Sequence, residues 1–145
     1  MKEQMRIELH NETEYTERIS FQDVWTRTKE LKYDGCRVAA ITDRNSVNGI
    51  HMAEHYFQRE GIQPIYGVTL NCIDVDDRYD VVLLAANLTG RDNIFRLIEL
   101  LERNRFSFGR AATREQLDAH RKGILLGAAA KNGQIVRAIL HRRDQ

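Results

Sequence analysis

The sequence predicts an α/β fold, with a mainly parallel sheet of about five strands and flanking helices. Short apolar runs rich in β-branched residues, such as residues 38–41 and 81–85, are typical of strands that are covered on both faces. Between these runs apolar residues recur at helical spacing, most clearly over residues 89–101. Strands that alternate with helices along a chain form parallel sheets joined by right-handed crossovers, so the order of elements predicts this fold class.

The N-terminal elements begin with a strand over residues 5–10, where apolar and polar residues alternate. A helix follows, with Ser20 as its expected cap, Asp23 at the capping-box distance and Gly35 at its end. The inward face of this helix carries Val24, Thr28 and Leu31. Residues 37–41 form the expected second strand.

The next helix is expected to begin at Ser46, as its cap, and to stop at Gly61. Its inward positions are Ile50, Ala53, Tyr56 and Phe57. Residues 64–73 form the third expected strand, and a tight acidic turn over residues 74–77 leads to the fourth at residues 81–85.

The C-terminal elements begin with the clearest helix of the chain, which opens at Thr89. Its apolar residues at helical spacing are Ile94, Leu97, Ile98 and Leu101. Thr113 is the expected cap of a short helix. Residues 123–127 form the last expected strand and residues 134–141 the last helix.

The composition limits the classes of function that this chain can have. The chain has 145 residues, enough for one domain with an ordinary core. Its net charge of +1 produces no overall electrostatic attraction to nucleic acid or to an anionic membrane. Its apolar runs are far too short to span a membrane. The two cysteines lack CxxC spacing, so we expect a reduced, cytoplasmic protein without membrane partners.

The segment from Ala39 to Gly49 carries the strongest functional signal. Its apolar strand stops at Thr42-Asp43 and delivers polar side chains to the carboxyl end of a strand, where α/β folds place their sites. Together with residues 9–15 (LHNETEY) and 65–69 (IYGVT), the segment resembles the PHP (polymerase and histidinol phosphatase) family. The family motifs read approximately AITDHG, LHxHTxYS and IxGxE. The framework residues agree, and the metal-ligand positions differ.

Two further segments resemble the polymerase branch of that family. Residues 79–94 are similar to the YHxxLLAxNxxGxxNL segment of PHP domains in bacterial DNA polymerase III alpha subunits, and residues 122–134 to their EGLLxGSGCxxGE segment. Residues 71–77 resemble the C-type alpha subunit of Gram-positive bacteria. In that subtype an exonuclease domain interrupts the PHP domain near this point, whereas here a tight turn joins the strands, so the subtype stays open.

The resemblance implies a single PHP-like domain over residues 1–145, folded as a partial (βα)7 barrel. The last strands of the family's domain are missing from the sequence. The chain is therefore expected to be either a fragment of a larger polymerase or a naturally shortened relative.

The resemblance also implies a three-metal site for phosphoester hydrolysis, built from imidazoles and carboxylates. His10 matches the family's first histidine ligand, and Glu12 and Asp80 place carboxylates where the family has histidines. The other ligand positions carry residues that we do not expect to bind metal, namely Ile19, Arg44, Thr69 and Ala130.

We therefore expect no cofactor, or at most one weakly bound zinc or manganese ion on His10, Glu12 and Asp80. The alternative is that Arg44 pairs with Glu12 or Asp80 and replaces the missing cations. Asp43, Arg44 and Thr69 are expected to line the cleft.

Three other clusters have simpler explanations. His51 and His55 share a helical face at a spacing that zinc can use, but no glutamate follows His51 as the metalloprotease pattern requires, so two exposed histidines are the favoured interpretation. The acidic turn lacks the glycine and the later glutamate of a calcium loop. Arginines flank two phenylalanines near the end of the long helix, which predicts either contact with nucleic acid or a charged loop at the helix end. These arginines are Arg103, Arg105, Arg110 and Arg114.

Three classes of function follow. The favoured class is a catalytically inactive PHP-like domain with a structural or interaction role, whose partner is the rest of a polymerase alpha subunit or a replisome protein. The alternatives are a metal-dependent phosphoesterase with a reduced site and a nucleic-acid contact module. The open edge of the strand at residues 124–126 predicts either a homodimer or a last helix folded back over that edge.

Overall fold

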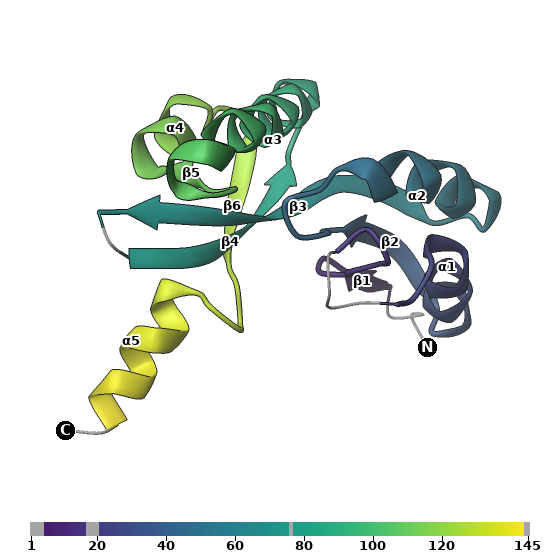
Figure 1. Cartoon of the computed structure of the whole chain (residues 1–145). Coiled ribbons are helices and arrows are strands. Elements are labelled where there is room, and N and C mark those ends of the chain that lie inside the picture. Colours follow the sequence, from purple (N-terminus) through teal and green to yellow (C-terminus); the bar gives the residue numbers. More distant parts are fainter. Residues whose placement is uncertain (1–4, 17–20, 76, 144–145) are drawn as a thin grey trace. The chain divides into compact units, whose positions relative to one another are not determined.

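We describe the protein from a computed structural model that covers residues 5–16, 21–75 and 77–143, without the side chains of Phe106 and Phe108. The chain forms two compact units, Met1–Val68 and Thr69–Gln145, and each is described by itself. Figure 1 shows the elements of both units.

The first unit is a small parallel sheet with two helices. Its strands are β1 (Arg6–Glu8), β2 (Cys36–Ile41) and the first part of β3 (Gln63–Asp74), and its helices are α1 (Val24–Tyr33) and α2 (Asn48–Arg59). β1 pairs with β2, and β2 with β3, in parallel register, as the strand–helix alternation predicts. The core lies between sheet and helices, and its buried residues are Val24, Leu31, Cys36, Ala39, Ile41, Ala53, Phe57 and Ile62.

The helix starts of the first unit differ from the expectation. Asp23 caps α1, because its carboxylate accepts a hydrogen bond from the Thr26 N–H at 2.8 Å; Ser20 lies outside the described residues. Helix α2 begins at Asn48, and Val47 stands at its cap without a side-chain bond. The prediction that Ser46 caps α2 was therefore wrong: its hydroxyl accepts from the Asn48 N–H at 3.3 Å, one position too early for a cap.

The second unit contains the rest of β3, then β4 (Asp77–Ala85), α3 (Leu88–Phe108), β5 (Ala112–Thr113), α4 (Arg114–Ala119), β6 (Ile124–Ala128) and α5 (Gln134–Arg143). β5 pairs with β3 in parallel, but β6 pairs with β4 in antiparallel register, with Leu83 opposite Leu126. β3 and β4 are neighbours joined by a tight turn, a connection that only antiparallel strands allow. In this unit β5 thus pairs with β3 in parallel, whereas β4 and β6 form the antiparallel part.

The long helix α3 is held at its start by two glycines. The Asn87 side chain accepts from the Gly90 N–H at 3.0 Å and caps the helix. A Cβ on Gly90 would lie 1.8 Å from the Gly123 carbonyl oxygen, so only glycine permits this approach. The helix buries Ile94, Leu97 and Leu101, as their spacing predicts. Thr113 caps α4 in a complete capping box with Gln116, also as expected.

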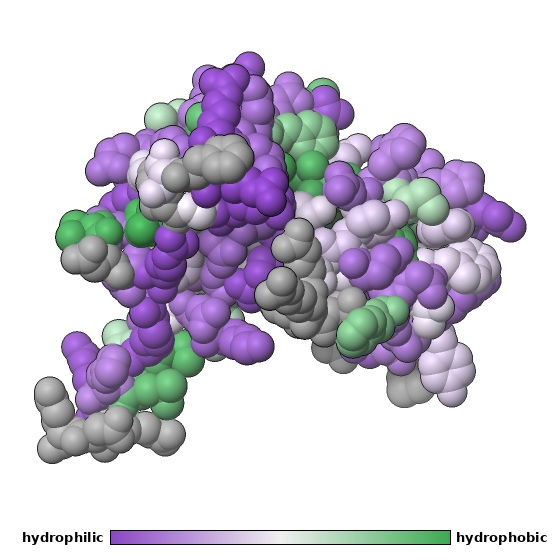
Figure 2. Space-filling view, viewed as in Figure 1, coloured by the Kyte–Doolittle hydropathy of each residue, from purple (hydrophilic) through white to green (hydrophobic). Residues whose placement is uncertain are grey.

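β6 is the last strand in the order of the sheet, and apolar side chains stay exposed on it and on α5. Figure 2 shows hydrophobic surface along α5. The exposed residues are Leu125, Leu126, Ile135, Ile139 and Leu140. The prediction of a homodimer or a folded-back helix at this edge stays a prediction. Among the described residues, no helix is long and apolar enough to cross a membrane.

Candidate functional site

The loop after β1 is tied to the end of β2. The Asn11 carbonyl oxygen accepts from the Thr42 N–H at 2.7 Å, and the Asn11 amide donates to the Ala40 carbonyl at 2.7 Å. Arg27 of α1 donates two hydrogen bonds to Oδ1 of Asn11, at 2.6 and 2.8 Å. Both the carbonyl oxygen and the amide nitrogen of the Asn11 side chain thus help to fix this loop at the end of β2.

Asp43 lies at the centre of this site and is almost completely buried, with 1% of its surface exposed. Its carboxylate accepts from the Thr13 N–H at 2.5 Å, the Thr13 hydroxyl at 2.8 Å and the Thr16 hydroxyl at 2.9 Å. Both carboxylate oxygens are thus bound to the β1 loop. We call Asp43 with Thr13 and Thr16 the Asp43 lock. The polar residue at the end of β2 thus has a structural role, because its buried carboxylate is hydrogen-bonded to the β1 loop.

Burial raises the pKa of the Asp43 carboxyl above its ordinary value, and the hydrogen bonds from Thr13 and Thr16 oppose this shift. The carboxylate is therefore stabilised by neutral donors of its own unit. Neutral donors hold a buried carboxylate less strongly than a cation would.

Gly49, in the first turn of α2, lies directly against the Asp43 lock. A Cβ at this position would stand 2.5 Å from Oδ2 of Asp43, 3.1 Å from the Tyr15 ring and 3.3 Å from the Thr13 hydroxyl. Only a residue without a side chain lets the helix approach the carboxylate this closely. The spacing Asp43–Gly49 in the sequence motif therefore has a steric cause.

The other first-unit site residues lie around the same loop. His10 is exposed, and Glu12 and Arg44 are half-buried. The Arg44 N–H donates to the Thr16 hydroxyl at 3.0 Å, which joins the residue after Asp43 to the lock. The pairing of the Arg44 guanidinium with Glu12 or Asp80 stays a prediction. Ile19, at another ligand position, lies outside the described residues.

The second unit contains an equivalent arrangement around Asp80, which is 2% exposed. Its carboxylate accepts from the side-chain amides of Asn71 and Asn132, the latter at 3.1 Å. The Asp80 N–H also donates to the Asn132 carbonyl at 3.2 Å, so Asp80 joins β4 to the loop after β6. We call this group the Asp80 clamp. A hollow of about 200 Å³ beside it is lined by Asp80, Tyr79, Leu126 and Ile135, among others.

The remaining family ligand positions in the second unit carry residues that are poor metal ligands. Thr69 is buried in β3, and Ala130 is exposed. Burial and the neighbouring Asp80 charge raise the pKa of the Cys72 thiol to about 12, so the free thiol stays protonated at neutral pH. Within either unit, the described residues contain no group of three His, Cys, Asp or Glu side chains that could hold a metal. The donor set of each unit thus does not fit a multinuclear centre.

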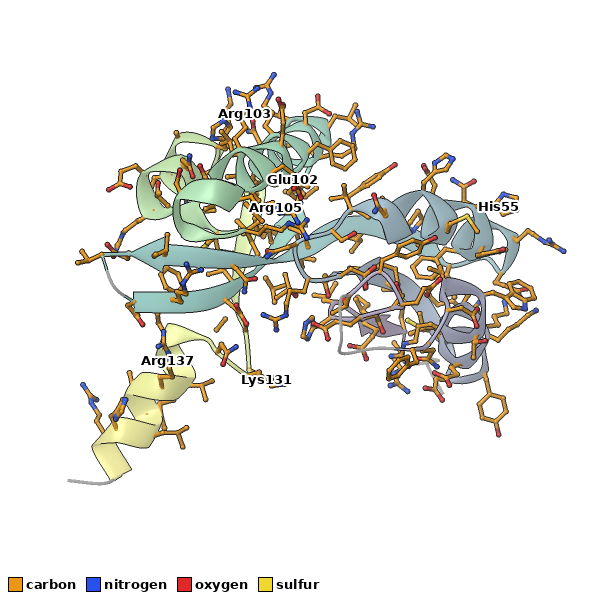
Figure 3. All side chains as sticks on the ribbon, in the orientation of Figure 1. His55, Glu102, Arg103, Arg105, Lys131 and Arg137 are labelled. Carbon is orange, nitrogen blue, oxygen red and sulfur yellow. The ribbon has the colours of Figure 1, made fainter. Side chains whose placement is uncertain are left out.

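Of the arginines proposed for nucleic-acid contact, two lie on α3, which extends further than expected, while Arg110 follows this helix and Arg114 begins α4. The predicted charged loop is helical through Phe108. Arg103 pairs with Glu99 at 2.5 Å and Arg110 with Glu102 at 2.6 Å, while Arg105 is exposed. Figure 3 shows Glu102, Arg103 and Arg105 on this helix. The two ion pairs reduce the local positive charge, and the contact with nucleic acid stays a prediction.

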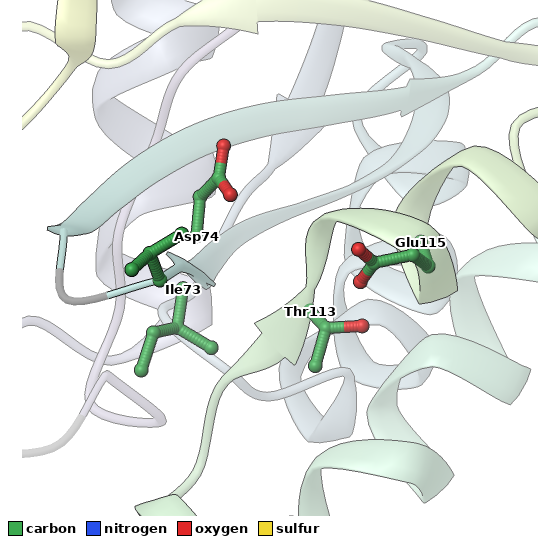
Figure 4. Close-up of a pocket in the computed structure, with 5 residues that line it drawn as sticks. Ile73, Asp74, Thr113 and Glu115 are labelled. Atoms are coloured by element: carbon green, nitrogen blue, oxygen red, sulfur yellow. The ribbon is translucent and has the colours of Figure 1, made fainter.

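The acidic turn borders a shallow hollow of about 290 Å³ (Figure 4). Ile73, Asp74, Val75, Thr113 and Glu115 line it. The Asp74 carboxylate forms an ion pair with Arg114 at 3.1 Å, so its charge is balanced by a side chain of the protein itself. This agrees with a solvated turn in place of a calcium loop.

Sequence reasoning placed Asp43 at the site and missed its partners. Thr13 and Thr16 stand in the same segment as His10 and Glu12, yet no residue-level pattern distinguishes a threonine that binds a carboxylate from an exposed one. Asn71 and Asn132 were missed for the same reason, because they are far apart in sequence and meet only in the fold. Gly49 was quoted in the motif, and its role appears only from the 2.5 Å approach to Asp43.

Comparison with known proteins identifies the family. Residues 8–145 match the PHP domain family. The DNA polymerase III alpha subunit of Helicobacter pylori is 25% identical over 135 residues, which cover 88% of this chain and 11% of that protein. The PolC-type DNA polymerase III of Bacillus subtilis is 33% identical over 67 residues, or 46% of this chain and 5% of that protein. The chain thus spans about a tenth or less of these relatives.

Two solved structures resemble the fold at 16% identity. An amidohydrolase from Chromobacterium violaceum, with bound sulfate and no metal, has a TM-score of 0.57 over 68% of this chain and 34% of its own. A candidate metal-dependent phosphoesterase from Bifidobacterium adolescentis has a TM-score of 0.50 over 80% of this chain and 43% of its own. These likenesses confirm the predicted α/β fold class. Since the family match covers nearly the whole chain, the protein belongs to the PHP domain family.

Proposed function

We propose that this chain is a PHP domain of the kind found in bacterial replicative polymerases, in which internal hydrogen bonds have replaced the metal centre. Its role is then structural: it stabilises, or contacts, the remainder of a DNA polymerase III alpha chain or another replisome protein. The polymerase relatives support the context, since in them the matched segment is a small part of a longer chain.

The observation that carries the proposal is that two buried carboxylates, Asp43 after β2 and Asp80 within β4, are used in hydrogen bonds. Asp43 accepts three hydrogen bonds from Thr13 and Thr16, and Asp80 is bound by Asn71 and Asn132. The bonds to Asp43 use three of the roughly four lone-pair sites of its carboxylate, and those to Asp80 use two, so only part of either carboxylate is left for a metal ion. Both carboxylates instead connect segments that are distant in sequence, which is a stabilising role.

The residues at the family's other ligand positions support the same conclusion. A guanidinium at Arg44 is permanently charged and repels metal cations. Thr69 is a neutral hydroxyl and Ala130 has no donor atom, so neither replaces a carboxylate or a thiolate. These substitutions remove the Lewis acid that phosphoester hydrolysis in this family is expected to need.

A hydrolysis assay with added metal tests the proposal. The purified chain is incubated with bis(p-nitrophenyl) phosphate and Mn²⁺ or Zn²⁺, next to a His10→Ala variant and a metal-free blank. We expect the wild type and the variant to hydrolyse the ester no faster than the metal ions alone. Metal-dependent turnover that is lost in His10→Ala would contradict the proposal and establish the reduced-site phosphoesterase.

The interaction role needs a separate measurement. The chain is mixed with the remaining alpha-chain segment of a bacterial DNA polymerase III, and association is followed by sedimentation. We expect a complex that survives EDTA, because no metal is involved in holding the fold. Absence of any complex would contradict the interaction role, while a complex that dissociates in EDTA would contradict the metal-free fold.

A further inference from the structure

The outer face of α2 carries two imidazoles that the proposed function does not use. His51 and His55 are four residues apart in one helix, and both are exposed. Side chains at this spacing lie on the same face, with their Cβ atoms about 5–6 Å apart. Figure 3 shows the His55 ring extending outward from α2.

These imidazoles line one hollow of about 330 Å³, together with Met52, Glu54 and Gln58. The His55 ring contacts the Tyr56 ring edge-on, with centroids 5.4 Å apart, which limits the orientations of the imidazole. Glu54 adds a negative charge to the wall of the hollow. Its carboxylate accepts from the Tyr66 hydroxyl at 2.9 Å, so it is held in the wall of the hollow beside the imidazoles.

We propose that His51 and His55 form a two-imidazole site for a late first-row divalent metal ion on the surface of α2. Neutral imidazole nitrogens are ligands of borderline metals, and affinity for a nitrogen site rises from Mn²⁺ to Cu²⁺ and falls again at Zn²⁺. The site therefore binds Cu²⁺ more tightly than Zn²⁺ and does not bind Mg²⁺ or Ca²⁺, which require oxygen ligands. Water completes the coordination on the open side of the hollow.

The cation of the same helix, Arg59, contacts an aromatic ring of α1. Arg59 lies over the Trp25 ring, 5.8 Å from its centroid, and Lys29 lies over the same ring at 4.2 Å. Both charges are thus held against an aromatic side chain on α1. The negative charge of Glu54 and the thioether of Met52 are the lining groups that favour a borderline divalent cation in the hollow.

The test is a titration of the whole chain with CuCl2, and separately with ZnCl2, at neutral pH, read by calorimetry and by electron paramagnetic resonance for Cu²⁺. We expect one Cu²⁺ per chain with hyperfine coupling to two imidazole nitrogens. His51→Ala and His55→Ala should each weaken Cu²⁺ binding roughly tenfold or more, since even outer partners of metal ligands are worth about 10–100-fold.

His120→Ala and His10→Ala are the matched controls, because they remove an imidazole at another place and leave α2 intact. Unchanged affinity in both controls supports the site on α2. Loss of binding in His10→Ala alone would place the ion at the remnant family site and overturn the proposal. Equal affinity in the wild type, His51→Ala and His55→Ala would also overturn it. Exposure of both histidines means that the variants are expected to fold normally.

Discussion

Replacing Gly49 by alanine tests the Asp43 lock most sharply, because helix propensity and packing predict opposite results. In an ordinary helix the change would stabilise the protein by about 0.8–1.0 kcal/mol. Here the new Cβ would stand 2.5 Å from Oδ2 of Asp43 and 3.1 Å from the Tyr15 ring. Real Cβ atoms do not approach an oxygen so closely, so either the carboxylate or the helix must move.

The expected cost follows from these contacts. Inserting a methyl group into a well-packed site costs about 1–3 kcal/mol. Hydrogen bonds to a charged acceptor are worth about 1.5–3 kcal/mol each, and a displaced carboxylate weakens at least one of its bonds to Thr13 and Thr16. After subtraction of the propensity gain, we expect Gly49→Ala to lower the free energy of unfolding by about 1–3 kcal/mol.

Urea denaturation of four proteins measures this effect: the wild type, Gly49→Ala, Asp43→Ala and the double variant. Asn48→Ala is the matched control, because Asn48 is exposed in the same helical turn and should leave stability unchanged or slightly raised.

The double variant contains the decisive comparison. Without the Asp43 carboxylate, the Cβ at position 49 keeps only its contacts with the Tyr15 ring at 3.1 Å and the Thr13 hydroxyl at 3.3 Å, so the same change should cost clearly less in the Asp43→Ala background. Contacting residues typically show such coupling at about 0.5–3 kcal/mol. An equal cost of Gly49→Ala in both backgrounds would refute the reasoning.

Three further changes test the charge of Asp43, the turn after β3 and the edge at β6. Burial raises the pKa of Asp43 in the folded state, so the folded protein binds this proton more tightly than the unfolded chain does. The stability advantage of the wild type over Asp43→Asn should therefore be largest below the ordinary pKa of 3.8 and shrink as the pH rises through the folded-state pKa. Denaturation curves in which this advantage grows with pH would contradict the prediction. Val75 has a positive φ of 54° and is 88% exposed, so Val75→Asn should relieve strain of about 1 kcal/mol and raise the melting temperature, whereas a lower one would count against strain at this turn. If the edge at β6 and α5 forms a homodimer, sedimentation should show a dimer that Ile139→Asp converts to a monomer; a wild type that is already monomeric excludes this arrangement.

The sequence allowed the parallel half of the fold to be predicted, since apolar runs alternate there with amphipathic helices. The antiparallel pairing of β4 with β6 was not expected, because an apolar run such as residues 81–85 reads the same in either direction of pairing. The start of α2 was misplaced because Ser46 has the composition of a cap, whereas its position relative to the helix depends on how the loop carrying Asp43 is held.

For the site, the position of Asp43 at the end of β2 was predictable, since a polar residue follows a buried strand. Its raised pKa and its partners Thr13 and Thr16 were not, because both depend on contacts between residues 27 to 30 positions apart. The Asp80 clamp depends in the same way on Asn132, which is 52 residues distant in the chain. Patterns over a few neighbouring residues of the sequence do not reveal such long-range contacts.

Elemental analysis of the protein, purified without chelators, tests the central claim most directly. The account predicts no stoichiometric zinc, manganese or iron, and a melting temperature that EDTA leaves unchanged, because hydrogen bonds to Asp43 and Asp80 hold the segments that a metal centre would otherwise join. Two or more bound metal ions per chain, with a melting temperature that falls in EDTA, would contradict it.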